Sequence, residues 1–230
     1  VEYVGNPLLD EARVHQGRED FRAAHGLIGE GPLLGLFPGS RRNELRYNLE
    51  TILATAAAVL REEPGARFLL PVAPSLGRQL IAERLSGSAL PVTLVEESIY
   101  DVANACDAVL CVSGTVTLQV ALVGTPLAIL YKMAPLTYAI GRRLVKVSFI
   151  GLVNIVAGES VAREFIQQEA SPENLSAELL RLLRDGDYAA RMREQLARVR
   201  EKMGEPGCSD RVALMASEMS RGIVRRGHVK

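Results

Sequence analysis

Short apolar runs alternate with helical patterns between residues 33 and 131. The runs are rich in Leu, Val and Ile and have the length of buried strands. They cover residues 33–37, 67–72, 92–95, 108–112 and 127–131. Apolar positions at helical spacing fill the gaps, at 44–63, 76–85, 99–105 and 116–123. This alternation predicts an α/β fold, a Rossmann-like parallel sheet with helices on both faces.

Residues 108–131 carry no charge and are long enough to span a bilayer. Two breaks argue against a membrane helix, Ser113-Gly114-Thr115 and Gly124-Thr125-Pro126, and β-branched residues are frequent between them. We therefore predict two strands around a helix for this stretch.

The pattern changes on either side of this region. After Pro172 it is helical, with expected helices at 175–183, 188–203 and 211–219. Before residue 31 it is polar and interrupted by Asn6-Pro7, which is typical of a linker. We therefore expect a linker at 1–30, a Rossmann-like domain at 31–171 and a C-terminal helical tail at 172–230.

Composition removes several classes of function. Lys plus Arg and Asp plus Glu both total 27, and Trp is absent, which disfavours nucleic-acid binding. The three cysteines, Cys106, Cys111 and Cys208, fit buried structural thiols in a reducing compartment. Isolated histidines give no metal constellation, and no basic-then-apolar signal segment follows Val1. We expect a cytoplasmic protein without a metal or other cofactor.

Two loops carry candidate chemistry. Pro38-Gly39-Ser40-Arg41 and Ser113-Gly114-Thr115 each follow a predicted strand and precede a helix. Ligands of parallel sheets bind outside the carboxyl ends of strands, where free helix amides and arginine attract phosphate. An ordinary strand-to-helix turn is the alternative for either loop alone. Two such loops at one edge indicate an anion site, with Gly39 allowing close approach of the backbone.

Five motifs in order resemble the C-terminal half of lipid-A-disaccharide synthase, a family of glycosyltransferases. They are Tyr3-Val4-Gly5-Asn6-Pro7-Leu8, Phe37-Pro38-Gly39-Ser40-Arg41, Ser113-Gly114-Thr115, Tyr131-Lys132 and Asn154-Ile155-Val156-Ala157-Gly158. The resemblance implies one half of a GT-B fold, in which two Rossmann-like domains face each other across a cleft. It also implies transfer from UDP-2,3-diacylglucosamine to the lipid acceptor lipid X, with release of UDP.

By this resemblance the chain is the UDP-sugar-binding half. The acceptor groove and the acidic general base belong to the family's N-terminal domain, so we expect no catalytic residue here and UDP binding without turnover. Arg41 and the amides of Ser113, Gly114 and Thr115 would stabilise the leaving diphosphate. The resemblance adds Ser40, Lys132 and Asn154 to the nucleotide site.

Several of these residues have an alternative interpretation. Lys132 also fits the solvated end of a strand, and Ser40 also fits a helix cap. Asn154 lies in an uncharged stretch, where a polar amide needs a partner. Gln119 stands where the family usually has Glu, a ribose ligand, and its amide oxygen can still accept a hydrogen bond from a ribose hydroxyl. Arg42 and Arg46 are expected on the solvated surface.

Residues 135–149 predict an amphipathic helix, with Arg142, Arg143 and Lys146 along one edge. Such a helix suits either membrane-surface contact or packing on a core with a solvated edge. Membrane-surface contact would place the protein on the inner face of the inner membrane.

The sequence leaves open whether the protein forms a homodimer. It also leaves two rival functions, a non-catalytic nucleotide or sugar-phosphate binding module and a GT-B nucleotide-sugar epimerase.

Overall fold

A computed structural model describes residues 3–134, 138 and 148–221. A parallel sheet forms its centre, and within this part of the chain it has six strands in the order β3-β2-β1-β4-β5-β6. The strands are β1 (Leu33–Phe37), β2 (Arg67–Pro71), β3 (Val92–Val95), β4 (Ala108–Val112), β5 (Leu127–Tyr131) and β6 (Glu164–Ile166). The predicted Rossmann-like α/β class is confirmed.

Every residue of β1 and of β4 is buried, because these two central strands have neighbours on both sides and helices on both faces. The edge strand β3 is only partly buried. β6 was not predicted from the sequence, because its three residues are too few for a periodic signal.

Helices α3 (Arg42–Glu62), α4 (Arg78–Leu85), α5 (Ile99–Ala105) and α6 (Val116–Val123) connect the first five strands. All four were expected, and α5 and α6 have the predicted bounds. From the centre of the sheet, β1, β2 and β3 follow one another toward one edge, and β4, β5 and β6 follow one another toward the other edge. Right-handed crossovers therefore place α3 and α6 on opposite faces of the sheet.

The uncharged stretch at residues 108–131 forms β4, α6 and β5, as predicted. Within the described residues, no helix is both long and apolar enough to cross a membrane. The basic residues Arg142, Arg143 and Lys146 lie outside the described residues, so the membrane contact expected of them stays a prediction.

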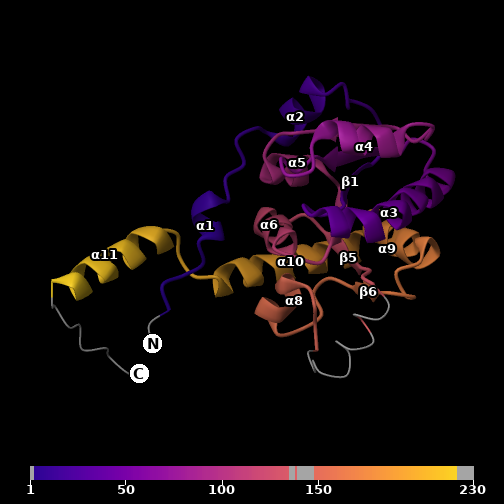
Figure 1. The fold of residues 1–230 in the computed structure, drawn as a ribbon. Coiled ribbons are helices and arrows are strands. Elements are labelled where there is room, and N and C mark those ends of the chain that lie inside the picture. The colour runs from indigo at the N-terminus through magenta and orange to yellow at the C-terminus, as the bar shows by residue number, and fades with distance from the viewer. Residues whose placement is uncertain (1–2, 135–137, 139–147, 222–230) are drawn as a thin grey trace.

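The predicted C-terminal helices are α9 (Pro172–Arg184), α10 (Gly186–Lys202) and α11 (Cys208–Ser220). α9 packs against α3, β4 and β5, so it covers the sheet of the domain that it was expected to follow. α10 packs against α6, α9 and the short helix α8 (Leu152–Ala157). Figure 1 shows α11 beside the N-terminal helix α1 (Leu8–Glu11), away from the sheet.

The segment before residue 31, expected as a linker, contains α1 and α2 (Arg18–Ala24). Phe21 on α2 is fully buried against the domain, and α2 packs on α5. Arg18 and Arg22 both pair with Asp107, which also accepts the backbone N–H of Leu33 at 2.7 Å. This segment therefore adds to the core near the starts of β1 and β4.

The three cysteines are free and buried, as predicted. Burial raises the pKa of the Cys106 and Cys111 thiols far above its usual range. These two thiols are consequently protonated and unreactive at neutral pH.

Candidate functional site

The two candidate loops lie side by side because β1 and β4 are neighbours in the sheet. Phe37, at the end of β1, is in register with Cys111, one residue before the end of β4. The chain leaves β1 toward one edge of the sheet and β4 toward the other, which makes this position the topological switch point. A cavity of about 480 Å³ opens there.

Seven of the nine predicted site residues line this cavity. They are Gly39, Ser40, Arg41, Ser113, Gly114, Thr115 and Gln119. The segments that follow β2 and β3 supply much of the remaining wall, together with the ends of β1 and β4 and the first turns of α3, α5 and α6. Lys132 and Asn154 are not among the lining residues.

The loop after β1 holds its shape through Gly39 and Glu44. Gly39 has φ of +96°, and a Cβ at this position would collide with the Glu44 carboxylate. That carboxylate accepts the backbone N–H groups of Ser40 at 3.0 Å and Arg41 at 3.3 Å. The Arg41 side chain is 82% exposed and pairs with Glu44 at 3.2 Å. Ser75 donates its hydroxyl to the Ser40 carbonyl oxygen.

The loop after β4 presents its donors differently. Ser113 donates its hydroxyl to the Ile150 carbonyl oxygen at 2.8 Å, which ties the loop to the segment before α8. Among the described residues, the amides of Gly114 and Thr115 have no acceptor within hydrogen-bond distance. A Cβ on Gly114 would meet nothing within 4 Å, so the space beside these donors is open.

Gln119 lies on α6 at the cavity wall, one turn after Thr115. The hydroxyl of Tyr100, on α5, lies beside its amide, and burial raises the pKa of this hydroxyl. Tyr100 therefore stays neutral at neutral pH.

The opposite wall is acidic. Glu96 and Glu97 follow β3 and line the cavity with Ser98 and Ile99. His25 Nε2 lies 3.0 Å from Glu97 Oε1, and its ring stacks on Phe21. Burial opposes ionisation of Glu97, but hydrogen bonds from the backbone and from His25 outweigh it and lower its pKa. The cavity thus has a donor-rich side and a carboxylate side.

Lys132 lies outside the cavity. Its ammonium group donates to Thr51 Oγ1 at 2.8 Å, and its backbone N–H donates to Asn48 Oδ1 at 2.9 Å. These bonds fasten the end of β5 to the middle of α3. Lys132 therefore performs a structural task beside the site.

Asn154 is fully buried, and its side chain bonds within the chain. Its amide nitrogen donates to the Ala162 carbonyl oxygen at 2.7 Å and to Glu164 Oε1 at 2.8 Å. Its carbonyl oxygen accepts the N–H groups of Val161 and Ala162, both at 2.9 Å. The partner expected for a polar amide in this stretch is thus the chain itself, and Asn154 shapes the turn before β6.

Sequence reasoning did not find Glu44, Ser75 or the acidic pair Glu96 and Glu97. One signal was available for Glu44, because glutamate at the third position of a helix commonly accepts the amide before the helix. Glu96 and Glu97 join the cavity only through the parallel order of β1, β2 and β3.

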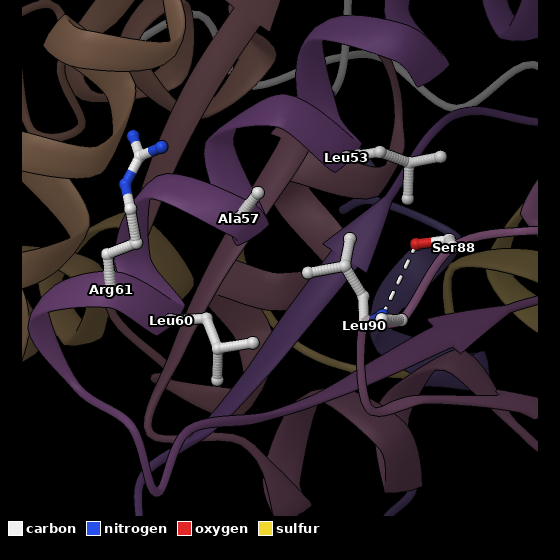
Figure 2. Close-up of a pocket in the computed structure, with 7 residues that line it drawn as sticks. Leu53, Ala57, Leu60, Arg61, Ser88 and Leu90 are labelled. Atoms are coloured by element: carbon white, nitrogen blue, oxygen red, sulfur yellow. Dashed lines mark hydrogen bonds between the residues drawn. The ribbon is translucent and has the colours of Figure 1, made fainter.

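A second hollow of about 430 Å³ lies between α3 and residues 88–90. Figure 2 shows Leu53, Ala57 and Leu60 along α3, with Leu90 across from them and the Arg61 guanidinium directed away from Leu90. Its walls are apolar and offer few hydrogen-bond donors. It lies along the C-terminal half of α3, away from the two candidate loops.

Across the described ranges, no three His, Cys, Asp or Glu residues gather as ligands for a metal ion. Among the described residues, the donors on the donor-rich side of the cavity are backbone amides, hydroxyl groups and the Arg41 guanidinium.

A six-stranded parallel sheet with donor-rich loops at its switch point defines a Rossmann-like domain of the kind found in GT-B folds. Solved structures share this fold. The C-terminal domain of a group 1 family glycosyl transferase from Francisella tularensis matches with a TM-score of 0.53 at 11% identity, covering 82% of this chain and 93% of that one. UDP-GlcNAc 2-epimerase from Neisseria meningitidis, bound to UDP-GlcNAc, matches with a TM-score of 0.59 at 15% identity over 93% and 54% of the two chains.

The chain belongs to the lipid-A-disaccharide synthetase family, whose model matches residues 1–218. Lipid-A-disaccharide synthase of Syntrophotalea carbinolica is 56% identical over 97% of this chain, and that of Geobacter sulfurreducens is 47% identical over 95%. In both cases the chain spans 57% of the relative's length.

Proposed function

We propose that this chain is the donor-binding half of a glycosyltransferase that joins UDP-2,3-diacylglucosamine to lipid X and releases UDP. The observation that carries the proposal is the cavity at the switch point, where the loops after β1 and β4 converge. The family membership supports the choice of reaction.

The donor-rich side of the cavity suits the leaving diphosphate. When the bond from sugar to phosphate breaks, negative charge grows on the diphosphate, and preorganised donors stabilise it without reorganising. The amides of Gly114 and Thr115 and the guanidinium of Arg41 are such donors. A forked guanidinium can bind two phosphate oxygens at once.

The acidic side of the cavity suits the nucleoside. Carboxylates repel phosphate but accept hydrogen bonds from hydroxyl and N–H groups. Glu96 and Glu97 therefore orient the uridine toward the end of β3 and the diphosphate toward Arg41. Gln119 lines the same cavity, and we propose that it binds the ribose, the role expected of it from the sequence.

The acceptor and the group that activates it belong to the part of the family's fold that this chain does not span. The chain spans 57% of the length of the two curated relatives named above. We propose that the chain alone binds UDP without catalysing transfer.

Calorimetric titration of UDP tests the site. Wild type should bind UDP, and Arg41→Ala should weaken binding about tenfold, because a charge-assisted bond to phosphate is lost. Arg42→Ala is the matched control, since Arg42 is an exposed neighbour with the same charge outside the cavity. Equal affinity of wild type and Arg41→Ala would remove Arg41 from the site.

A further inference from the structure

The Glu44 carboxylate lies where the β1 loop would hold a phosphate. One of its oxygens accepts the amides of Ser40 and Arg41, and the other pairs with the Arg41 guanidinium. Gly39 leaves room for this contact because it has no Cβ. Two amides and a guanidinium at the start of α3 are the groups that bind a phosphate at a helix N-terminus.

The second loop shows the contrast. The amides of Gly114 and Thr115 have no acceptor among the described residues, whereas those of Ser40 and Arg41 are both engaged. All four residues line one cavity, and Glu44 lines it with them. A diphosphate entering the cavity can use the second loop directly, but it must compete with Glu44 for the first.

Glu44 also has an ordinary capping role, because a glutamate at the third helical position often accepts the amide of the residue before the helix. Two features go beyond a cap. The carboxylate reaches the amide of Ser40, one residue further back, and it pairs with the guanidinium of Arg41, which also lines the cavity.

We propose that Glu44 is a specificity-determining competitor, a carboxylate that holds the phosphate donors of the first loop and is exchanged for the diphosphate on binding. This inference rests on the proposed function of the same cavity. The exchange replaces one anion by another, so donors and arginine are never left unpaired. It also weakens the net hold on UDP, which favours release of the leaving group after transfer.

Glu44→Gln separates this role from capping. Glutamine keeps an oxygen that can accept the Ser40 and Arg41 amides, but it has no charge to hold Arg41 or to repel phosphate. We expect UDP to bind Glu44→Gln about tenfold more tightly than wild type in calorimetric titration. Uridine, which lacks phosphate, should bind both proteins equally.

Glu50→Gln is the matched control, because Glu50 is an exposed glutamate on the same helix outside the cavity. It should leave UDP affinity unchanged. Thermal unfolding of each variant, measured alongside, shows that the folded protein is being titrated. Equal or weaker UDP binding by folded Glu44→Gln would overturn the inference.

Pyrophosphate separates this inference from the proposed function. It should also bind Glu44→Gln more tightly than wild type, because the competition concerns phosphate alone. If wild type bound pyrophosphate but not UDP, the proposed nucleotide ligand would be wrong. The pyrophosphate affinities of wild type and Glu44→Gln would still show whether Glu44 competes with phosphate. Failure of pyrophosphate to bind more tightly would overturn the inference by itself.

Discussion

At the scale of single residues, the same chemistry serves binding in one place and architecture in another. Asn154 and Arg41 are both polar residues beside parallel strands, yet Asn154 is fully buried with four internal hydrogen bonds and Arg41 is largely exposed. Buried polar groups must find partners within the fold, whereas an exposed guanidinium can exchange the partner it has for a ligand.

Asn154→Ala should therefore act on stability. It removes the side-chain acceptor of the Val161 and Ala162 amides and takes one of its donors from the Glu164 carboxylate. We expect the free energy of unfolding to fall by about 2–4 kcal/mol, measured by denaturant titration. Under conditions where the variant is folded, UDP affinity should stay within about threefold of wild type. A stable variant that had lost UDP binding would instead make Asn154 a direct ligand.

At the scale of elements, helix ends carry the electrostatics. The starts of α3 and α6 provide the donors of the cavity, and the start of α11 is capped by Asp10 of α1. Its carboxylate accepts the backbone N–H groups of Gly207 and Ser209. Arg211 donates to the carbonyl oxygens of Val4, Glu205 and Pro206, so α11 depends on the first residues of the chain.

The Asp10 cap makes the attachment of α11 dependent on pH. Hydrogen bonds from the Gly207 and Ser209 amides lower the pKa of Asp10 below its ordinary value of 3.8. A lowered pKa means that ionised Asp10 stabilises the fold above pH 3.8, and that this contribution is lost as the pH falls through the folded pKa. We expect the protection of the Gly207 and Ser209 amides against hydrogen exchange, relative to their intrinsic exchange rates at each pH, to fall there.

Asp10→Asn is the control for this pH effect. Its amide oxygen still accepts a hydrogen bond but does not titrate, so the pH step at the two amides should disappear. Amides of β4 in the buried sheet should show no comparable step in either protein. A step that persists in Asp10→Asn would assign the pH dependence to another group.

At the scale of the whole molecule, α2 before the α/β repeat and α9 after it belong to its core. Phe21 of α2 is fully buried, and α9 packs directly on β4 and β5. The divisions expected at residues 31 and 172 thus mark changes of sequence pattern. The packing of the described chain runs across both of them.

Phe21→Ala tests whether the N-terminal segment belongs to the cooperative unit. Removing a fully buried ring should lower the free energy of unfolding by about 3–5 kcal/mol, in one transition seen by circular dichroism and by fluorescence of a dye attached near the sheet. Ile28→Ala is the control, since Ile28 in the same segment is 74% exposed. A loss confined to α2, with the main transition unmoved, would make the segment a separate appendage.

Much of the fold could be read from the sequence because its signals are local. A strand such as Leu33–Phe37 is apolar at every position because both of its faces are buried. Pro64-Gly65 ends α3 because proline lacks the N–H that a helix needs. The two phosphate-type loops follow from the same logic. Strand ends in a parallel sheet meet at one edge, so Gly39–Arg41 and Ser113–Thr115 were brought together as expected.

The tertiary structure alone decided what each polar side chain faces. It turned Asn154 and Lys132 inward to their own chain, added Glu96 and Glu97 to the cavity through the order of the strands, and laid Glu44 across the donors of the first loop. These outcomes depend on distances between residues far apart in sequence or on one rotamer at a helix start. The periodic pattern of apolar residues determines the helices and strands because it reflects which positions are buried. Which acceptor each hydrogen-bond donor finds is determined only when the helices and strands pack together.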